Sequence, residues 1–509
     1  MVVLVSRRDF VLPHLEWEVF NEPVSITTVV EQERLPKGQT CILVNRDENY
    51  NLRAVMKFKD PSFDRVSGKS KDILGSFAEL FDIQGSDSKS LSYTLESAVF
   101  GDIEHEISAE TGFSGTATIH FGGLRVKTGN NNKGTHLTEW FLNGPKDHVF
   151  SRITNRRVFR AFSRERIESR DSKLDHIETS LEAQKSTEDP FKIFDYVDTP
   201  FETSSKRVDF LKIKTDNLQF LVEKVPDGIG PNWSSNLAIE YRKTWGGIPD
   251  VAEREEILEV CSFVFGRQLL QIGYTLYDQN ENVVEAYARD PWGRTAKSFC
   301  SKPDYPPVNI EAIPSLHKAE TIISKLLPKY CELGEPLCFK EALWNYWISR
   351  QMPLGTNLPI LAAGVESIIN RWFHCSKSKS KGLYLDKEEF GKLLGDEIQR
   401  IGKKLEGTPY GKKITGKILR ANEFGMIDNY RKFFEEINLP ISEKECQALT
   451  GRHKFVHGGA LFDKTDWKKV AQQSNTFETL FNKILLKLLD YSGTFVDRST
   501  VGWPEVQLN

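Results

Sequence analysis

The sequence has few cysteines and no long hydrophobic run, and each shortage excludes a class of protein. Its seven cysteines in 509 residues are odd in number and scattered, and none forms a Cys-x-x-Cys pair. This pattern indicates neither a disulfide framework nor a zinc ribbon. No stretch approaches the roughly 20 apolar residues of a membrane span, and the N-terminus lacks a signal peptide's apolar run. We therefore expect a cytoplasmic protein whose cysteines are reduced and lie in its core.

The glycine motifs that bind phosphate are also missing. Lys69 and Ser70 follow Gly68, but the first glycine of a phosphate loop would fall on Phe63, so the spacing excludes that loop. No dinucleotide fingerprint, no cluster of Cys and His and no group of carboxylates with metal-ligand spacing is found. The sequence therefore implies no metal and no organic cofactor.

Neither sign of charge dominates the chain. The formal net charge is −3, and residues 311–509 carry about +5, which leaves about −8 for the rest. A mildly basic back part suits contact with phosphate groups. The length allows two to four domains, and the 27% of charged residues and 39% of hydrophobic residues are ordinary for a globular protein.

The front part, residues 1–305, carries mainly strand signals, with turn-forming residues between them. A charged stretch near residues 164–190 is either an exposed helix with many ion pairs or a solvated connector that separates two subdomains. Residues 253–266 have helical spacing and end at a glycine. Strands are predicted at Leu15–Phe20, Val24–Val30, Thr116–Phe121, Val208–Lys214, Leu218–Val225 and on both sides of Gln279-Asn280. We expect a β-rich region of sandwich or barrel type.

From residue 310 to 509 the apolar spacing is helical, after several prolines that mark a domain boundary. Phe339, Leu343 and Trp347 share one helix face, which is either core packing or a platform for nucleobases. The run Lys403–Arg420 is either a solvated loop or a grip on a phosphate backbone through Lys412, Lys413 and Lys417. Helices are predicted from Ser315 to about Leu333, at Phe339–Arg350 and Asn357–Cys375, within Lys387–Lys404 and Phe424–Ile437, and over about Asp466–Tyr491. The class is thus α+β, with a β-rich front and a helical back.

The segment Ser442–Gly459 combines a fixed positive charge with titratable groups. Ser442 and Glu445 predict a capping box at the start of a helix, and Gly458 predicts its end. Arg452 offers a planar fork of donors to phosphate oxygens, and His457 can exchange a proton near neutral pH. Five residues on a helix turn through about 140°, so the two side chains do not share a face. Either a second copy of the segment across a two-fold axis completes a site, or Arg452 forms an ion pair and His457 caps the helix.

This segment, with Arg452, the polar His453 and then His457, resembles the signature of the HEPN superfamily, which is set in an all-helical bundle. The back part resembles the ApeA-like HEPN group, and the front part resembles the β-rich ApeA N-terminal domain. The block from Ser262 to Asp278 contributes most to the second resemblance. HEPN domains of this kind are typically homodimeric, metal-independent endoribonucleases of prokaryotic phage defence and toxin systems.

The resemblance implies a cytoplasmic, abortive-infection endoribonuclease that needs no cofactor. Arg452 would stabilise the scissile phosphate and His457 would act as general acid or base, with His453 and Lys454 in supporting roles. The expected partners are an RNA substrate, for example a tRNA, a second copy bound through the HEPN domain, and a phage-derived trigger. The front part would sense a trigger, restrain the nuclease or select the RNA. HEPN modules also serve as non-catalytic dimerisation or nucleotide-binding scaffolds, so a regulatory scaffold is the alternative.

Overall fold

The computed structural model describes residues 24–150, 210–311 and 318–508. Within these ranges the gaps are residues 33, 40, 61–62, 64–79, 89, 109–111, 130–132, 226–230, 281, 292–295, 376–381 and 457–466. The predicted strand Leu15–Phe20, the charged stretch at 164–190 and the predicted cap Ser315 lie outside the described residues. The chain divides into two compact units, residues 1–305 with 310–324, and residues 306–309 with 325–509. Each unit is described by itself below.

The first unit contains a 14-stranded sheet in which every strand pairing is antiparallel. Its neighbours run in the order β1-β3-β4-β7-β6-β8-β14-β13-β9-β12-β11-β10, and β2 and β5 branch from β6. Because this path has two ends, the described strands form an open sheet and not a closed barrel. The strands are β1 Val24–Ile26, β2 Thr28–Val29, β3 Cys41–Arg46, β4 Leu52–Phe58, β5 Phe81–Ser86, β6 Ser92–Ser108, β7 Gly112–His120, β8 Gly123–Lys127, β9 His136–Leu142, β10 Phe210–Lys214, β11 Gln219–Lys224, β12 Leu237–Arg242, β13 Leu270–Tyr277 and β14 Val283–Arg289.

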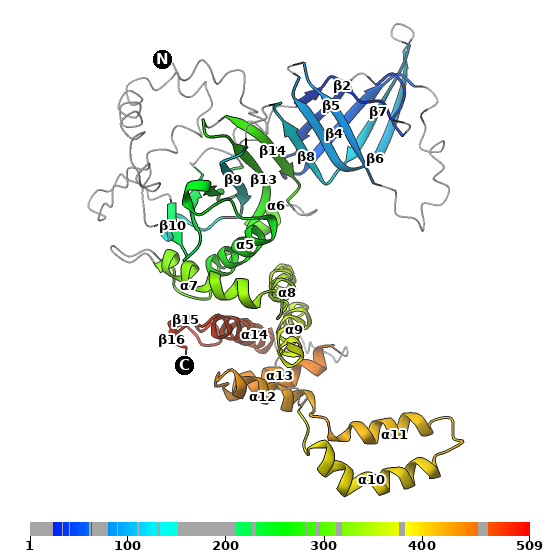
Figure 1. The fold of residues 1–509 in the computed structure, drawn as a ribbon, viewed down its shortest axis with the longest axis vertical. Helices are drawn as coiled ribbons and strands as arrows, with labels where there is room; N and C mark the ends of the chain where they lie inside the picture. Colours follow the sequence, from blue (N-terminus) through cyan, green and yellow to red (C-terminus); the bar gives the residue numbers. More distant parts are fainter. Residues whose placement is uncertain are drawn as a thin grey trace, which may run out of the picture. The chain divides into compact units, whose positions relative to one another are not determined.

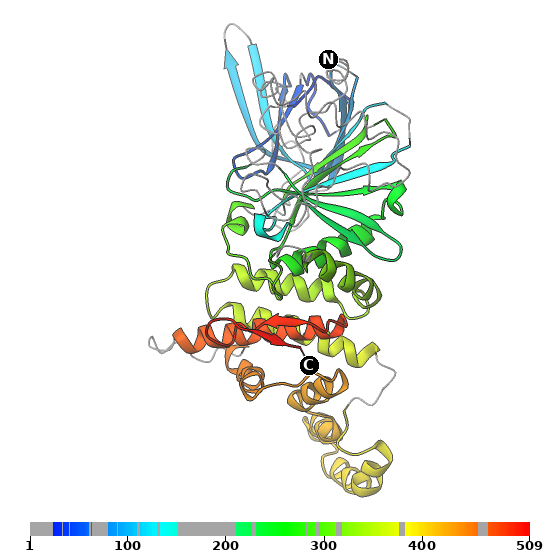
Figure 2. The ribbon, with the colours of Figure 1, turned by 90° about the vertical axis from the view of Figure 1, so that its left-hand side faces the viewer.

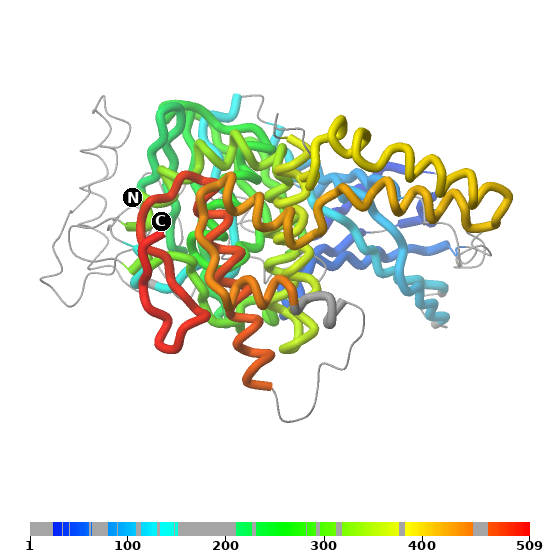
Figure 3. Tube along the Cα trace, turned by 90° about the horizontal axis from the view of Figure 1, so that it is seen from below, coloured from blue at the N-terminus to red at the C-terminus, as the bar shows by residue number. Residues whose placement is uncertain are grey.

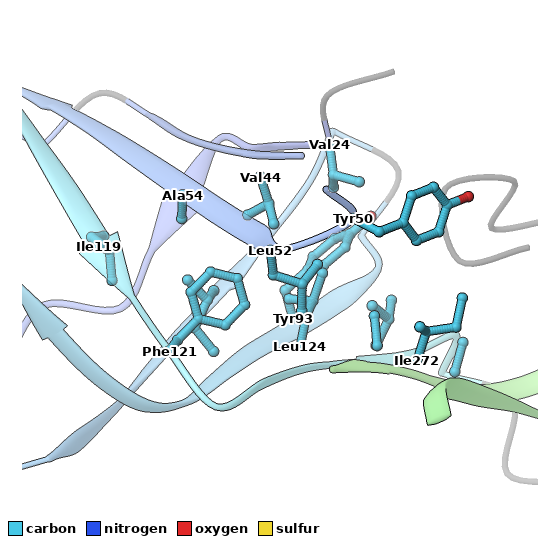
Figure 4. Close-up of a cluster of buried hydrophobic side chains, with 14 of the residues drawn as sticks. Val24, Val44, Tyr50, Leu52, Ala54, Tyr93, Ile119, Phe121, Leu124 and Ile272 are labelled. Carbon is cyan, nitrogen blue, oxygen red and sulfur yellow. The ribbon is translucent and has the colours of Figure 1, made fainter. Parts of the chain in front are cut away.

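Strand β6 is 17 residues long and joins two parts of this sheet. Its first residues pair with β5 and β8, and its later residues pair with β7 up to Ser108. Figure 2 shows the long ribbon that β6 and β7 form together. Figure 4 shows apolar side chains of β3, β4, β7, β8 and β13 converging in one core, among them Val44, Leu52, Ile119 and Leu124. The alternating burial along β4 follows from the two-residue period of a strand with one buried face.

Helix α5, Val251–Phe265, confirms the helix predicted at residues 253–266. Asp250 and Glu253 form a capping box at its start, which the sequence reasoning had not identified. Gly266 adopts a left-handed conformation with φ 64° and ends the helix, as its position predicted. A second, short helix of this unit is α6, Ala296–Cys300.

Helices make up most of the second unit (Figure 1). Helix α7 begins in the first unit and continues into the second. Helices α9 and α10 have the predicted bounds. Helices α8, α12 and α14 begin and end within three residues of their predicted bounds. The helices are α7 Lys318–Leu333, α8 Phe339–Gln351, α9 Asn357–Cys375, α10 Lys387–Lys404, α11 Gly411–Leu419, α12 Met426–Glu436, α13 Glu443–Val456 and α14 Trp467–Leu488. The protein is therefore an α+β protein with an antiparallel sheet region first and helices in its C-terminal half.

Two expectations about this unit change, and one alternative left open by the sequence is decided. The run Lys403–Arg420 is not a loop, because Gly411–Leu419 form helix α11. The back part is not entirely helical, because the strands β15, Thr494–Val496, and β16, Glu505–Gln507, pair near the end of the chain. Phe339, Leu343 and Trp347 are buried in the core, so their stripe is not a platform for nucleobases.

The cysteines agree only in part with the expected core positions. Cys261 and Cys300 are buried, whereas Cys331 and Cys375 are exposed, and none of the seven forms a disulfide bond. Burial raises the pKa of the Cys300 thiol to about 11, with smaller opposing effects from Ser234 and Arg267. The buried thiols are therefore protonated at neutral pH and behave as small apolar side chains.

Candidate functional site

Helix α13 carries the segment that the sequence singled out, and its start is the predicted capping box. The Ser442 backbone N–H donates to Glu445 Oε2 at 2.7 Å, and the Glu445 backbone N–H donates to Ser442 Oγ at 3.3 Å. Each side chain thus satisfies a backbone donor that the first turn leaves unpaired. The cap fixes where α13 begins and so the register of every later residue on it.

One side of α13 packs into the helical unit. Ala448 and Leu449 are buried, and the buried carboxylate of Glu445 accepts a hydrogen bond from Lys483 of α14 at 2.8 Å. The first turn of α13 therefore lies beside the later part of α14. Helix α14 begins at Trp467, so its own first turn lies at the opposite end from this contact. The two helices consequently run antiparallel.

Helix α9 lies against α14 and runs in the same direction. Asn357 Nδ2 donates to Ser474 Oγ at 2.5 Å near the start of α9. About two turns later, Gly364 faces Phe481, whose ring would be 3.6 Å from a Cβ at that glycine. Helix α12 is tied to the end of α9 by a hydrogen bond from Trp372 Nε1 to Glu436 at 2.7 Å. Helices α9, α12, α13 and α14 thus form the framework around the candidate segment.

Arg452, His453 and Lys454 lie in the last two turns of α13. Position 452 follows Glu445 by seven residues, about two turns, and so falls on the side of the helix that carries Ala448 and Leu449. His457 and the predicted stop at Gly458 lie outside the described residues, as do the side chains of residues 451–456. The distances among the predicted catalytic groups are therefore not part of the described geometry.

Lys412, Lys413 and Lys417 lie on helix α11, and all three are exposed. Lys413, Lys417 and Arg420 are spaced four and three residues apart, so they follow one face of that helix. The basic run was predicted from the sequence, but its helical conformation was not.

A polar cluster on the open sheet of the first unit was not predicted from the sequence. Arg125 on β8 donates from Nε to Glu96 at 2.8 Å and from Nη1 to Glu285 at 2.6 Å, and Tyr274 Oη also accepts from Nη1 at 3.0 Å. The Tyr274 and Tyr287 rings stack with centroids 5.3 Å apart. Only the pairing of β6, β8, β14 and β13 brings these residues together. Arg125 is already held by two carboxylates, so the cluster is an internally satisfied network.

A buried ion pair lies between helix α5 and the same sheet. Arg254 Nε donates to Glu139 Oε1 at 3.0 Å, and Gln271 Nε2 donates to the same oxygen at 2.7 Å. Burial raises the pKa of the Glu139 carboxyl group, and its interaction with Arg254 opposes that rise. The pair fixes α5 on the sheet, and nothing in its surroundings points to a reaction.

Neither a metal site nor a membrane-spanning helix is found among the described residues. The described part of the chain contains no group of three or more His, Cys, Asp and Glu side chains placed to hold a metal ion. Among the described helices, none is long and apolar enough to span a bilayer. Comparison with known proteins gives no family model, no curated protein and no solved structure that matches this chain.

Proposed function

We propose that this chain is a metal-independent endoribonuclease of the HEPN kind that cuts RNA in the cytoplasm during abortive infection by phage. The observation that supports the proposal is the place of Arg452, near the end of a capped helix that packs antiparallel to α14. The link between these two helices contains His457. An arginine and a histidine at the end of one helix of a bundle is the arrangement that the resemblance to HEPN proteins implies.

The chemistry needs a base, a fixed positive charge and an acid. A base takes the proton of the ribose 2′-hydroxyl, whose oxygen attacks the adjacent phosphorus. The bond from phosphorus to the 5′-oxygen breaks, and an acid protonates that departing oxygen. Arg452 stabilises the charge on the pentacoordinate phosphate. His457 moves the proton, and His453 and Lys454 position the substrate. One chain offers one His457, so a second copy across a two-fold axis supplies the second proton carrier.

The other parts of the proposal concern partners. RNA is the substrate, and tRNA is the first substrate to test. The exposed Lys412, Lys413 and Lys417 bind the RNA backbone as point charges. The β-rich first unit senses a phage-derived trigger or restrains the nuclease. Dimerisation was expected from the apolar faces of α9 and α14, but their apolar side chains are largely buried within one chain. Dimerisation therefore stays a prediction, and it requires a surface other than the apolar faces of α9 and α14.

The products of cleavage test the proposal. The 5′ fragment is expected to end in a 2′,3′-cyclic phosphate or its hydrolysis product, the other fragment to begin with a 5′-hydroxyl, and excess chelator to leave the rate unchanged. His457→Ala should lower the rate by about 10²–10⁴-fold and Arg452→Ala by about 10²–10³-fold. His453→Ala should cost less than either. Mass spectrometry of the fragments and rates in chelator give the measurements.

Matched controls separate chemistry from stability. Arg431 is an exposed arginine of α12 and His374 an exposed histidine at the end of α9, so Arg431→Ala and His374→Ala should retain full activity. Because position 452 lies toward the packed side of α13, thermal melting of Arg452→Ala must show that the fold survives. Cleavage abolished by chelator, or fragments with 5′-phosphates, would assign the activity to a different site. A folded chain without activity that still binds RNA would instead be the regulatory scaffold.

A further inference from the structure

Helix α10 is twice as long as the helix it packs against. It has 18 residues, whereas α11 has nine. Gly411, at the start of α11, lies against the backbone of Leu405, and Thr415 lies beside Gly402, 4.0 Å from the site of a Cβ. Figures 1 and 3 show the two helices side by side and turned away from the other helices of their unit. Helix α11 therefore covers the C-terminal half of α10, whereas the first half is mostly exposed as far as the described residues go.

That first half has an apolar strip with open space beside it. Leu393 is 62% exposed and Leu394 42% exposed. Gly391 and Gly395 are one turn apart, and nothing lies within 4 Å of a Cβ placed on either. Leu394 is on the same side of α10 as both glycines, whereas Leu393 is on the opposite side. Two small residues beside the exposed Leu394 give a surface on which another helix can pack closely. Of α10 only Ile398 is buried, which shows how little of this helix the rest of the chain covers.

Other exposed apolar side chains gather on the same hairpin. Tyr410 is 64% exposed, Ile414 41% and Leu419 54%. With Leu393 and Leu394, these are five of the 16 large hydrophobic side chains that are exposed among the described residues. They lie within residues 387–419, a small part of the chain. Such a concentration marks a surface that a partner covers.

The charges of the hairpin are divided along its length. Residues 386–397 contain five acidic and two basic residues, a net charge of −3, whereas residues 400–420 contain seven basic residues and one acidic residue, a net charge of +6. Lys392 pairs with Glu388 at 3.0 Å and Arg400 with Glu397 at 2.8 Å, but more than half of each side chain is exposed. Exposed ion pairs of this kind contribute little to stability, so their side chains can pair with charges of a second copy instead. The two halves therefore complement each other between two antiparallel copies.

We propose that the α10–α11 hairpin is a dimerisation arm that packs antiparallel against the hairpin of a second copy. The acidic half of α10 in one copy lies along Arg400, Lys403 and Lys404 of α10 in the other, so the lysines of α11 stay available to RNA. Leu394, Gly391 and Gly395 form the seam. A two-fold axis makes both contacts at once, as an isologous interface requires. RNA would use the basic half alone and leave the leucines and the acidic half without a role. The proposal is independent of the proposed nuclease activity, because its readout is association.

The first test compares two leucines of almost equal exposure in the full-length protein. Leu394→Glu puts a charge into the seam and should raise the dimer dissociation constant about tenfold or more, a loss of about 1.4 kcal/mol or more. Leu354→Glu is the matched control, since Leu354 lies between α8 and α9 and is 43% exposed. Gly395→Leu fills the open space without adding charge and should weaken the dimer in the same way. Sedimentation across concentrations measures association, and circular dichroism shows that the helices persist.

The second test uses charge reversal. Changing Glu388 and Glu389 to Lys should weaken self-association, and so should changing Lys403 and Lys404 to Glu. An equimolar mixture of the two variants should form a heterodimer near the wild-type strength, because each acidic half then again meets a basic one. A chain that stays monomeric at tens of micromolar, or a dimer insensitive to Leu394→Glu and to both reversals, would overturn the proposal. Loss of RNA binding by the Lys403 and Lys404 variant with unchanged association would make nucleic acid the occupant.

Discussion

Asp290 follows β14 directly, and its carboxylate accepts a hydrogen bond from the backbone N–H of Leu52. Burial raises the pKa of this carboxyl group, while that hydrogen bond and the charge of Arg46 oppose the rise. A carboxyl group whose pKa is higher in the folded chain binds its proton more tightly there. It adds stability as the pH falls through the raised pKa toward the unfolded value of about 3.9, and it costs stability above that window.

Replacing Asp290 by Asn should remove this pH dependence. The amide oxygen can still accept from Leu52, but the group no longer titrates. The free energy of unfolding of the wild type minus that of Asp290→Asn should therefore rise as the pH falls from 7 to 4, as measured by urea denaturation at each pH. Asp216→Asn, at an exposed position, is the control for the loss of one carboxylate charge. A difference that stays flat, or that grows with increasing pH, would contradict the assignment.

At the scale of elements, the helical conformation of α11 determines how its lysines are arranged. The helix fixes Lys413, Lys417 and Arg420 on one face, opposite the side that packs on α10, where Gly411 and Ile418 are buried or half-buried. A fixed row of positive charges can follow a phosphate backbone without ordering a loop first, so the ordering cost is small.

Removing the three lysines of α11 tests whether this helix binds the RNA backbone. In Lys412→Ala, Lys413→Ala, Lys417→Ala, affinity for single-stranded RNA should fall, and the slope of log K against log salt should become shallower by up to about 2. A triple variant of the first unit, Lys57→Ala, Lys214→Ala, Lys297→Ala, removes equal charge from exposed positions and should leave the slope unchanged. Binding titrations from 50 to 200 mM salt supply the comparison. Equal slopes for both triple variants would exclude α11 as a contact.

Elements with strong periodicity and caps could be predicted from the sequence. Helices α9 and α10 and the start of α13 at Ser442 follow from local patterns that the structure keeps. Helix α11 was missed because its nine residues are rich in lysine and glycine, and packing on α10 decides their conformation. The Arg125 cluster and the Glu139–Arg254 pair depend on which strands become neighbours, and no local pattern encodes that. The candidate segment was found by residue type and spacing, and its geometry stays a prediction.

The whole molecule consists of two compact units, each with a core of its own. In the first, Phe220 is fully buried and packs on Tyr241, with ring centroids 5.7 Å apart. In the second, Phe481 is fully buried and stacks on Tyr346 at 4.7 Å. Because a truncated core side chain loses contacts only in its own surroundings, its effect should be confined to one unit.

Truncation of either phenylalanine should therefore destabilise one unit and spare the other. Phe481→Ala should cost the helical unit about 3–5 kcal/mol, and Phe220→Ala should cost the sheet unit a similar amount. Hydrogen exchange followed by mass spectrometry reads both units in one experiment, since the slowest amides of each report its own opening. In Phe481→Ala the slow amides of α9 and α14 should exchange faster while those of β11 and β12 keep their rates, and Phe220→Ala should give the reverse. Faster exchange in both units from a single substitution would show instead that the chain unfolds as one cooperative body.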